Sequence, residues 1–128
     1  SYDIMVMNDY LFSIRHVTTL DCDVPTKGII LLVREHKFLF TLENLFGRAE
    51  DNALFADMRA VMEENGADSV MADDDFRKIQ IYFEGEDMAD ITLHLTYYTD
   101  QQYDISVPLN DVMDYMTDEV YDMFEFAR

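Results

Sequence analysis

The side chains best suited to chemistry are carboxylates near the C-terminal end, which recur at the spacing of one helix face. The apolar pattern predicts a helix over about Leu109–Phe126 with Asn110 as its cap. Apolar side chains would share one face, and five carboxylates would form a stripe on the opposite face at roughly 6 Å intervals. These are Asp111, Asp114, Asp118, Asp122 and Glu125. Phosphates along a nucleic-acid strand have a comparable spacing, so the stripe could imitate them.

This stripe is unfavourable for the helix itself. Like charges three or four residues apart repel one another by a few tenths of a kcal/mol per pair. Asp122 and Glu125 also oppose the negative end of the helix dipole. Local rules broken together are a frequent mark of function. The alternative is an ordinary solvated face of an acidic protein.

A second group of carboxylates falls in an expected hairpin, and aromatic residues fall on the strands around it. The carboxylates are Glu84, Glu86, Asp87 and Asp90. Tyr82 and Tyr98 are expected on the solvent face of the same strands, beside His94 and Ser106. Tyrosine adds contact area at a protein interface, so we include both tyrosines with the nine carboxylates as candidate partner-binding residues.

Catalytic and metal sites receive no support from the motifs. The acidic segment with Asp68, Asp73, Asp74 and Asp75 lacks the ligand and glycine positions of a calcium loop. The histidines and Cys22 do not have the spacing of a zinc site. Glycine-rich phosphate loops are also missing. We therefore expect no catalytic residue, no metal and no cofactor, and a function other than catalysis.

The net charge of −18 is distributed unevenly along the chain. Residues 1–48 contain six acids and five bases, whereas residues 49–128 contain 21 acids and four bases. No Lys or Arg occurs from Ile79 to Ala127. Such a surface would repel nucleic acid and anionic membranes. A basic protein is the natural electrostatic partner, while the nearly neutral N-terminal half could pair with a second copy of the chain.

The elements that must position these groups are strands and two amphipathic helices. Strands are expected at Asp3–Met7, Leu11–Val17, Gly28–Arg34 and Lys37–Glu43, with a turn at Asn8 and Asp9. A first helix is expected around Leu54–Met62, capped by Asp51 or Asn52 and closed by Gly66. Alternating apolar residues then predict three strands, listed here by their ranges: Lys78–Glu84, Asp90–Tyr98 and Gln102–Val107.

The resulting order, ββββ-α-βββ-α, predicts an α+β fold in which two helices pack on antiparallel sheet. A chain of 128 residues without a linker is expected to form one domain, 1–128. A single cysteine and a first segment without a signal-peptide pattern favour the cytoplasm. The longest apolar run is far shorter than a membrane span.

The leading hypothesis is an acidic binding protein that inhibits a basic nuclease or other nucleic-acid-binding protein by mimicking nucleic acid. In charge and size alone, the chain resembles the small acidic proteins that phages and mobile elements use against restriction or CRISPR enzymes. The main alternative is an interaction or immunity-type domain whose basic partner is unrelated to nucleic acid. Adaptation to high salt and an enzyme are two further alternatives. The balanced charge of residues 1–48 argues against the first, and the lack of a motif argues against the second.

Overall fold

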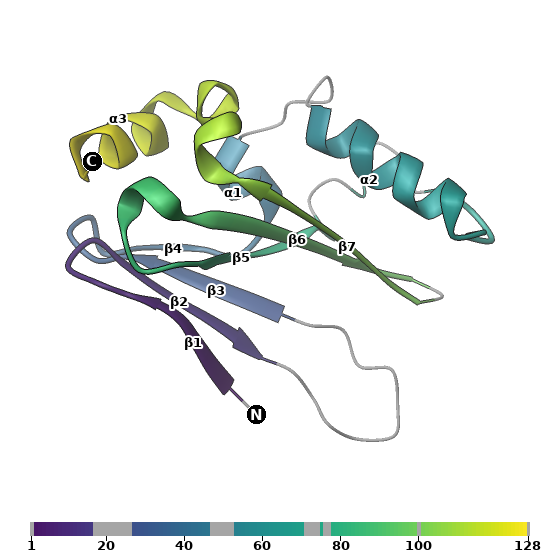
Figure 1. Cartoon of the computed structure of the whole chain (residues 1–128), viewed down its shortest axis with the longest axis horizontal. Coiled ribbons are helices and arrows are strands. Elements are labelled where there is room, and N and C mark those ends of the chain that lie inside the picture. The colour runs from purple at the N-terminus through teal and green to yellow at the C-terminus, as the bar shows by residue number, and fades with distance from the viewer. Residues whose placement is uncertain are drawn as a thin grey trace.

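A computed structural model describes residues 2–16, 27–46, 53–70, 75, 78–99 and 101–127. It contains a four-stranded and a three-stranded antiparallel sheet, in the orders β1-β2-β3-β4 and β5-β6-β7. We refer to them as sheet A and sheet B. In Figure 1, sheet B lies between sheet A on one side and helices α2 and α3 on the other. The α+β fold and the strand and helix order predicted from the sequence are thus confirmed, with one additional short helix.

Sheet A is a meander of neighbouring strands. It consists of β1 (Tyr2–Met7), β2 (Leu11–His16), β3 (Lys27–Leu32) and β4 (Lys37–Leu39). The expected turn after β1 is confirmed, because the Asn8 side-chain oxygen accepts hydrogen bonds from the backbone N–H groups of Tyr10 and Leu11 at 2.8 and 2.9 Å. An Asx turn of this kind reverses the chain without help from glycine.

The expectation that β4 continues to Glu43 was wrong. The strand ends at Leu39, and helix α1 (Leu42–Phe46) follows. The side-chain oxygen of Asn44 accepts hydrogen bonds from the backbone N–H groups of Phe40 and Thr41. These donors are therefore used locally, and the chain turns into a helix that buries Leu42, Leu45 and Phe46.

The first predicted helix and the three later strands were confirmed. Helix α2 (Ala53–Glu64) buries Leu54, Phe55, Met58 and Met62. Gly66 follows it with a φ of 71°, the left-handed conformation that glycine adopts at a helix end. The proposed caps, Asp51 and Asn52, lie outside the described residues. Sheet B consists of β5 (Gln80–Glu84), β6 (Thr92–Tyr98) and β7 (Gln102–Pro108), with a 3₁₀ turn, η2 (Met88–Asp90), between β5 and β6.

The two sheets approach each other closely because β5 crosses the strands of sheet A one after another with its free edge. Phe83 donates its backbone N–H to the hydroxyl of Ser13 on β2 at 2.9 Å, and Gly85 donates to the Met5 carbonyl on β1 at 3.3 Å. At Gly28 on β3, an added Cβ would lie only 1.8 Å from the Ile81 carbonyl oxygen. Small residues at these crossings allow the unpaired edge of β5 to be covered and its donors satisfied.

The single helix predicted over Leu109–Phe126 was also wrong. The chain forms two 3₁₀ turns, η3 (Leu109–Asp111) and η4 (Met113–Tyr115), before helix α3 (Asp118–Ala127). In a continuous helix, the Thr117 N–H would bond to the Met113 carbonyl. Instead it donates to the Leu45 carbonyl of α1 at 3.2 Å, and Met113 accepts from Met116. A 3₁₀ turn repeats every three residues, so it can satisfy the same apolar spacing.

The hydrophobic core contains side chains from both sheets and from the helices. Phe83 of β5 packs edge-on against Phe124 of α3, with ring centroids 5.5 Å apart.

No helix in the described part of the chain combines the length and apolar character needed to cross a membrane.

Candidate functional site

The nine candidate carboxylates are all exposed, but they come from five segments of backbone. Glu84 ends β5, Glu86 and Asp87 precede η2, and Asp90 ends it. Asp111 belongs to η3 and Asp114 to η4. The remaining three belong to α3: Asp118, Asp122 and Glu125. The expected five-residue stripe is thus not a row on one helix, and only its last three members keep helical spacing.

The carboxylates around η2 and those of η3 are far apart in the sequence, but two hydrogen bonds to backbone carbonyls bring their segments together. Leu109 donates its N–H to the Ile91 carbonyl at 2.9 Å, and the Asn110 side chain donates to the Ala89 carbonyl at 2.7 Å. These bonds join η3 to the segment around η2. Asn110 was expected to cap a helix and instead makes this connection. Because α3 packs on the end of β5 through Phe124, η2 and α3 lie at the same end of the molecule (Figure 1).

We call this region the acidic end and define it by eight exposed carboxylates. They are Glu86, Asp87, Asp90, Asp111, Asp114, Asp118, Asp122 and Glu125. Within the described residues, none of the eight forms an ion pair. Among the described bases of residues 1–48, Lys37 pairs with Glu119 of α3 at 3.0 Å. None of these described bases forms an ion pair with the eight carboxylates of the acidic end.

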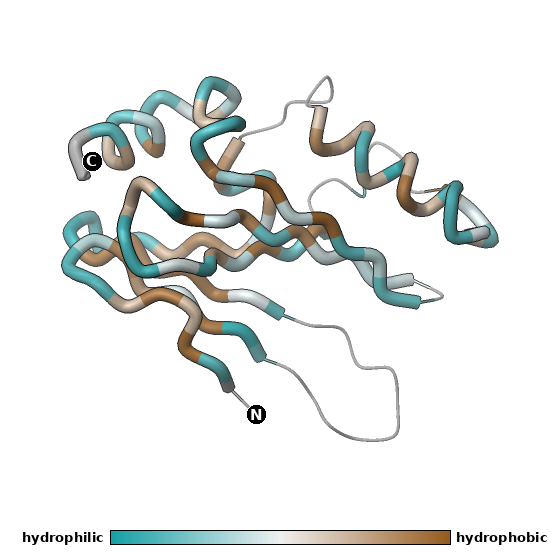
Figure 2. The backbone as a smooth tube through the Cα atoms, in the orientation of Figure 1, coloured by the Kyte–Doolittle hydropathy of each residue, from teal (hydrophilic) through white to brown (hydrophobic). Residues whose placement is uncertain are grey.

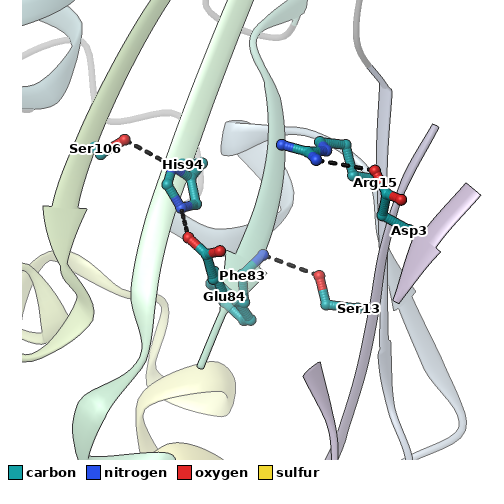
Figure 3. A network of polar contacts seen from close by, with 7 residues as sticks. All are labelled: Asp3, Ser13, Arg15, Phe83, Glu84, His94 and Ser106. Carbon is teal, nitrogen blue, oxygen red and sulfur yellow. Dashed lines mark hydrogen bonds and ion pairs between the residues drawn. The ribbon is translucent and has the colours of Figure 1, made fainter. Parts of the chain in front are cut away.

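The ninth carboxylate belongs to a polar contact on the face of sheet B. Glu84 lies 2.9 Å from Nε2 of His94, and Nδ1 of His94 lies 2.6 Å from the Ser106 hydroxyl (Figure 3). If Nε2–H donates to Glu84, Nδ1 accepts from the hydroxyl. Ser, His and a carboxylate in this order are the groups of an acyl-transfer enzyme.

The strand register accounts for this contact without a catalytic role. His94 is on the central strand, between Tyr82 of β5 and Ser106 of β7 in the register, so cross-strand neighbourhood explains the contact. Ser106 and Glu84 are exposed, and neither of the two cavities described below is lined by them. An exposed hydroxyl that lines neither of these cavities is not by itself a basis for assigning a reaction.

The expectation that Tyr82 lies on a solvent face was wrong. Only 8% of Tyr82 is exposed, whereas Tyr98 is partly exposed. The Tyr82 ring stacks on His94 with centroids 4.6 Å apart, and the Arg15 guanidinium lies 5.6 Å from its centre. Arg15 also pairs with Asp3 at 2.9 Å, and the hydrogen bonds to Asp3 and Tyr82 raise the pKa of Arg15. Tyr82 is therefore buried where sheet A meets sheet B, because β5 lies directly on β2 and β3.

An aromatic side chain that the sequence analysis did not select lies at the acidic end. Tyr115 ends η4, directly after Asp114, and is 47% exposed. The sequence did contain a signal for this residue, because Tyr115 does not fall on the apolar face of the predicted helix. An aromatic side chain among carboxylates is unusual for a surface that only contacts solvent. A half-exposed tyrosine offers contact area to a protein partner.

Two of the cavities in the described part of the chain border sheet A. One has a volume of about 460 Å³ and is lined by residues 8–10 and 86–89, including the carboxylates of Asp9, Glu86 and Asp87. The other, of about 360 Å³, is lined in part by His16, Lys27 and Phe40. Among the described residues no group of three His, Cys, Asp or Glu side chains is arranged to hold a metal ion. Asp73 and Asp74 lie outside those residues.

Comparisons of this chain with protein-family models, with curated proteins and with solved structures found no match.

Proposed function

We propose that the chain is a non-enzymatic binding protein whose acidic end docks on a basic surface of a nucleic-acid-binding protein, such as a nuclease, and inhibits it. The observation that supports this most is the set of eight exposed carboxylates without an ion-pair partner in the described residues. Ordinary surfaces intersperse charges of both signs. A basic protein would therefore be attracted strongly, and nucleic acid repelled.

The backbone segments that carry most of these carboxylates are tied to other elements. Leu109 and Asn110 donate hydrogen bonds to the η2 segment, Thr117 donates one to α1, and Phe124 anchors α3 in the core. A partner would thus meet an array that is already ordered, which lowers the entropic cost of association. A constellation drawn from several turns can also follow a curved groove, which a single straight helix cannot.

The arrangement within α3 adds a second argument. The first turn contains Asp118 and Glu119, which favour the positive end of the helix dipole, but no basic residue occupies the last turn. Glu125 is placed there instead. A helix selected only for stability would have Lys or Arg at that position, so the charge is better explained by a partner.

The proposal is tested by affinity capture from a native lysate at about 0.1 M and about 0.5 M salt, followed by elution with duplex DNA. We expect a basic protein that is retained at low salt, released at high salt and displaced by DNA, because screening weakens contacts between exposed charges. Retention of only neutral or acidic proteins, independent of salt, would contradict the proposal. A basic protein that DNA does not displace would favour the interaction-domain alternative.

A further inference from the structure

The cavity of about 360 Å³ lies beside the part of β3 that β4 does not cover. β4 pairs only with Ile30–Leu32, so in the described part of the chain no strand pairs with Lys27–Ile29 on that side. The cavity is placed there, between β3, Phe40 after the end of β4 and Gln80 at the start of β5. Figure 2 shows β2 and β3 as mainly apolar strands that become hydrophilic at their adjoining ends. The cavity therefore adjoins polar and apolar groups together.

The charge of the cavity wall differs from that of the chain as a whole. Among the lining residues that the structure describes, the ionisable side chains are both basic: His16 and Lys27, which are cross-strand neighbours on β2 and β3. The chain contains 27 acids and only nine Lys and Arg residues, so a wall of this kind is unusual in it. The larger cavity, by contrast, is lined by three carboxylates. Basic groups around a concave site favour an anionic ligand.

Two polar groups of this wall are not used by the described part of the chain. The Lys27 ammonium forms no ion pair there, and the side-chain amide of Gln80 forms no hydrogen bond there. Lys27 is exposed and Gln80 is half-buried, so both side chains are accessible to a ligand. An ammonium and an amide N–H are both donors. A carboxylate accepts hydrogen bonds from such donors, and the bond to the ammonium is the stronger because both groups are charged.

The apolar part of the wall consists of Ile29 and Phe40, which belong to the outer face of sheet A, the face turned away from β5. Phe40 is 47% exposed, and its ring stacks on Phe38 with centroids 6.0 Å apart. An aromatic ligand can extend such a stack, since rings attract one another in offset or edge-on arrangements. A cavity of this volume, with apolar walls and a few polar groups, has the character of a small-molecule site.

We propose that this cavity binds a small aromatic carboxylate, with its carboxylate group at Lys27 and Gln80 and its ring against Phe40. One negative charge matches one unpaired ammonium, and the His16 imidazole adds a polar group at the same end. A phosphate dianion would be repelled more strongly by a chain of net charge −18. The site is separate from the acidic end, because none of the described lining residues belongs to it.

The test is a nuclear magnetic resonance titration of the isotope-labelled chain with benzoate, naphthoate and indole acetate, each up to about 5 mM. We expect saturable binding of at least one of these probes. The signals that shift should be those of the Gly28 and Ile29 backbone N–H groups and the Gln80 side-chain amide, which line the cavity. The neutral amide analogue of the bound probe should bind about tenfold more weakly, because it lacks the charged acceptor.

Two variants and one control locate the bound probe. K27Q removes the ammonium and should raise the dissociation constant about tenfold. F40A removes the ring and should raise it by a similar factor. Lys27 and Phe40 are both exposed, so the circular dichroism of these variants should match that of the unchanged chain. The control K37Q makes the same change in net charge as K27Q, but Lys37 pairs with Glu119 and does not line the cavity. It should leave the affinity unchanged.

Absence of saturable binding for all three probes would overturn the proposal. Equal binding of the amide analogue would also overturn it, because the site would then recognise apolar rings and not a carboxylate. Equal weakening by K27Q and K37Q would assign the effect to overall charge instead of to this cavity. These outcomes are independent of the acidic end, since capture of a basic protein does not require the residues of this cavity.

Discussion

The outer face of sheet A and helix α3 expose opposite chemistry on opposite sides of sheet B. The first presents eight apolar side chains (Ile4, Met7, Phe12, Ile14, Ile29, Leu31, Phe38 and Phe40) and no carboxylate at the outward positions of its strands. The second contributes Asp118, Asp122 and Glu125 to an end whose eight carboxylates form no ion pair in the described part of the chain. Apolar and charged groups that are separated in this way cannot both serve simple solubility, since a soluble surface mixes them. The difference indicates two surfaces for two kinds of contact, one dependent on apolar burial and one on charge.

The junction of the sheets holds these two surfaces apart, and at Gly28 the backbones of β3 and β5 approach each other closely. G28A places a Cβ 1.8 Å from the Ile81 oxygen and 2.8 Å from the Tyr82 Cβ. Because both neighbours belong to a buried strand, we expect a loss of about 4 kcal/mol or more in the free energy of unfolding. Chemical denaturation measures this loss.

G66A provides the control for that experiment. Nothing lies within 4 Å of a Cβ added there, and only the positive φ of 71° is unfavourable. Its expected cost is about 1 kcal/mol. Equal losses in the two variants would mean that the sheets do not approach each other as closely as described.

The charged surface should also depend on an aromatic contact at Tyr115. Y115A removes contact area beside Asp114, and we expect about a tenfold loss of affinity for the captured basic protein. Isothermal titration calorimetry or surface plasmon resonance measures this affinity. Thermal stability should change little because the side chain is 47% exposed. Phe40 is exposed to the same extent but belongs to the outer face of sheet A. F40A should therefore leave this affinity unchanged. A loss of affinity in both variants would show that the two surfaces do not act separately.

The smallest expected effects lie within α3 and have opposite signs. E125K replaces an acid near the negative end of the helix dipole and should stabilise the fold by about 0.5 kcal/mol. D118K replaces an acid in the first turn, where a negative charge is favourable, and should destabilise it by a similar amount. Differential scanning calorimetry at low salt can resolve the difference. Stabilisation by both substitutions would show that overall charge relief outweighs the helix dipole.

Much of the fold follows from local sequence patterns. Period-2 alternation located β5, β6 and β7, and the apolar spacing followed by Gly66 located α2. The boundaries near Asn44 and Thr117 did not follow, because they depend on a side-chain bond to backbone N–H groups and on a bond to a distant helix. Thr117 followed by Asp118 and Glu119 was a usable helix-start signal, which the longer apolar period obscured.

The candidate site was predictable in composition but not in geometry. Exposure of the carboxylates follows from their charge. Their gathering at one end depends on the contacts of Leu109 and Asn110 with the η2 segment, which no local pattern encodes. Burial of Tyr82 depends on Ser13 and Gly28, whose small side chains let β5 approach sheet A closely. The sequence does not show that β5 crosses these two positions.

The central claim is that position at the acidic end, rather than total charge, recruits a basic partner. Two triple variants with the same change in net charge test it in one capture experiment: D118K/D122K/E125K on α3 and D57K/E63K/E64K on α2, all at exposed positions. The account predicts that the α3 variant loses the basic protein and the α2 variant retains it, with both chains folded by circular dichroism. Equal retention or equal loss of that protein by the two variants would contradict the account.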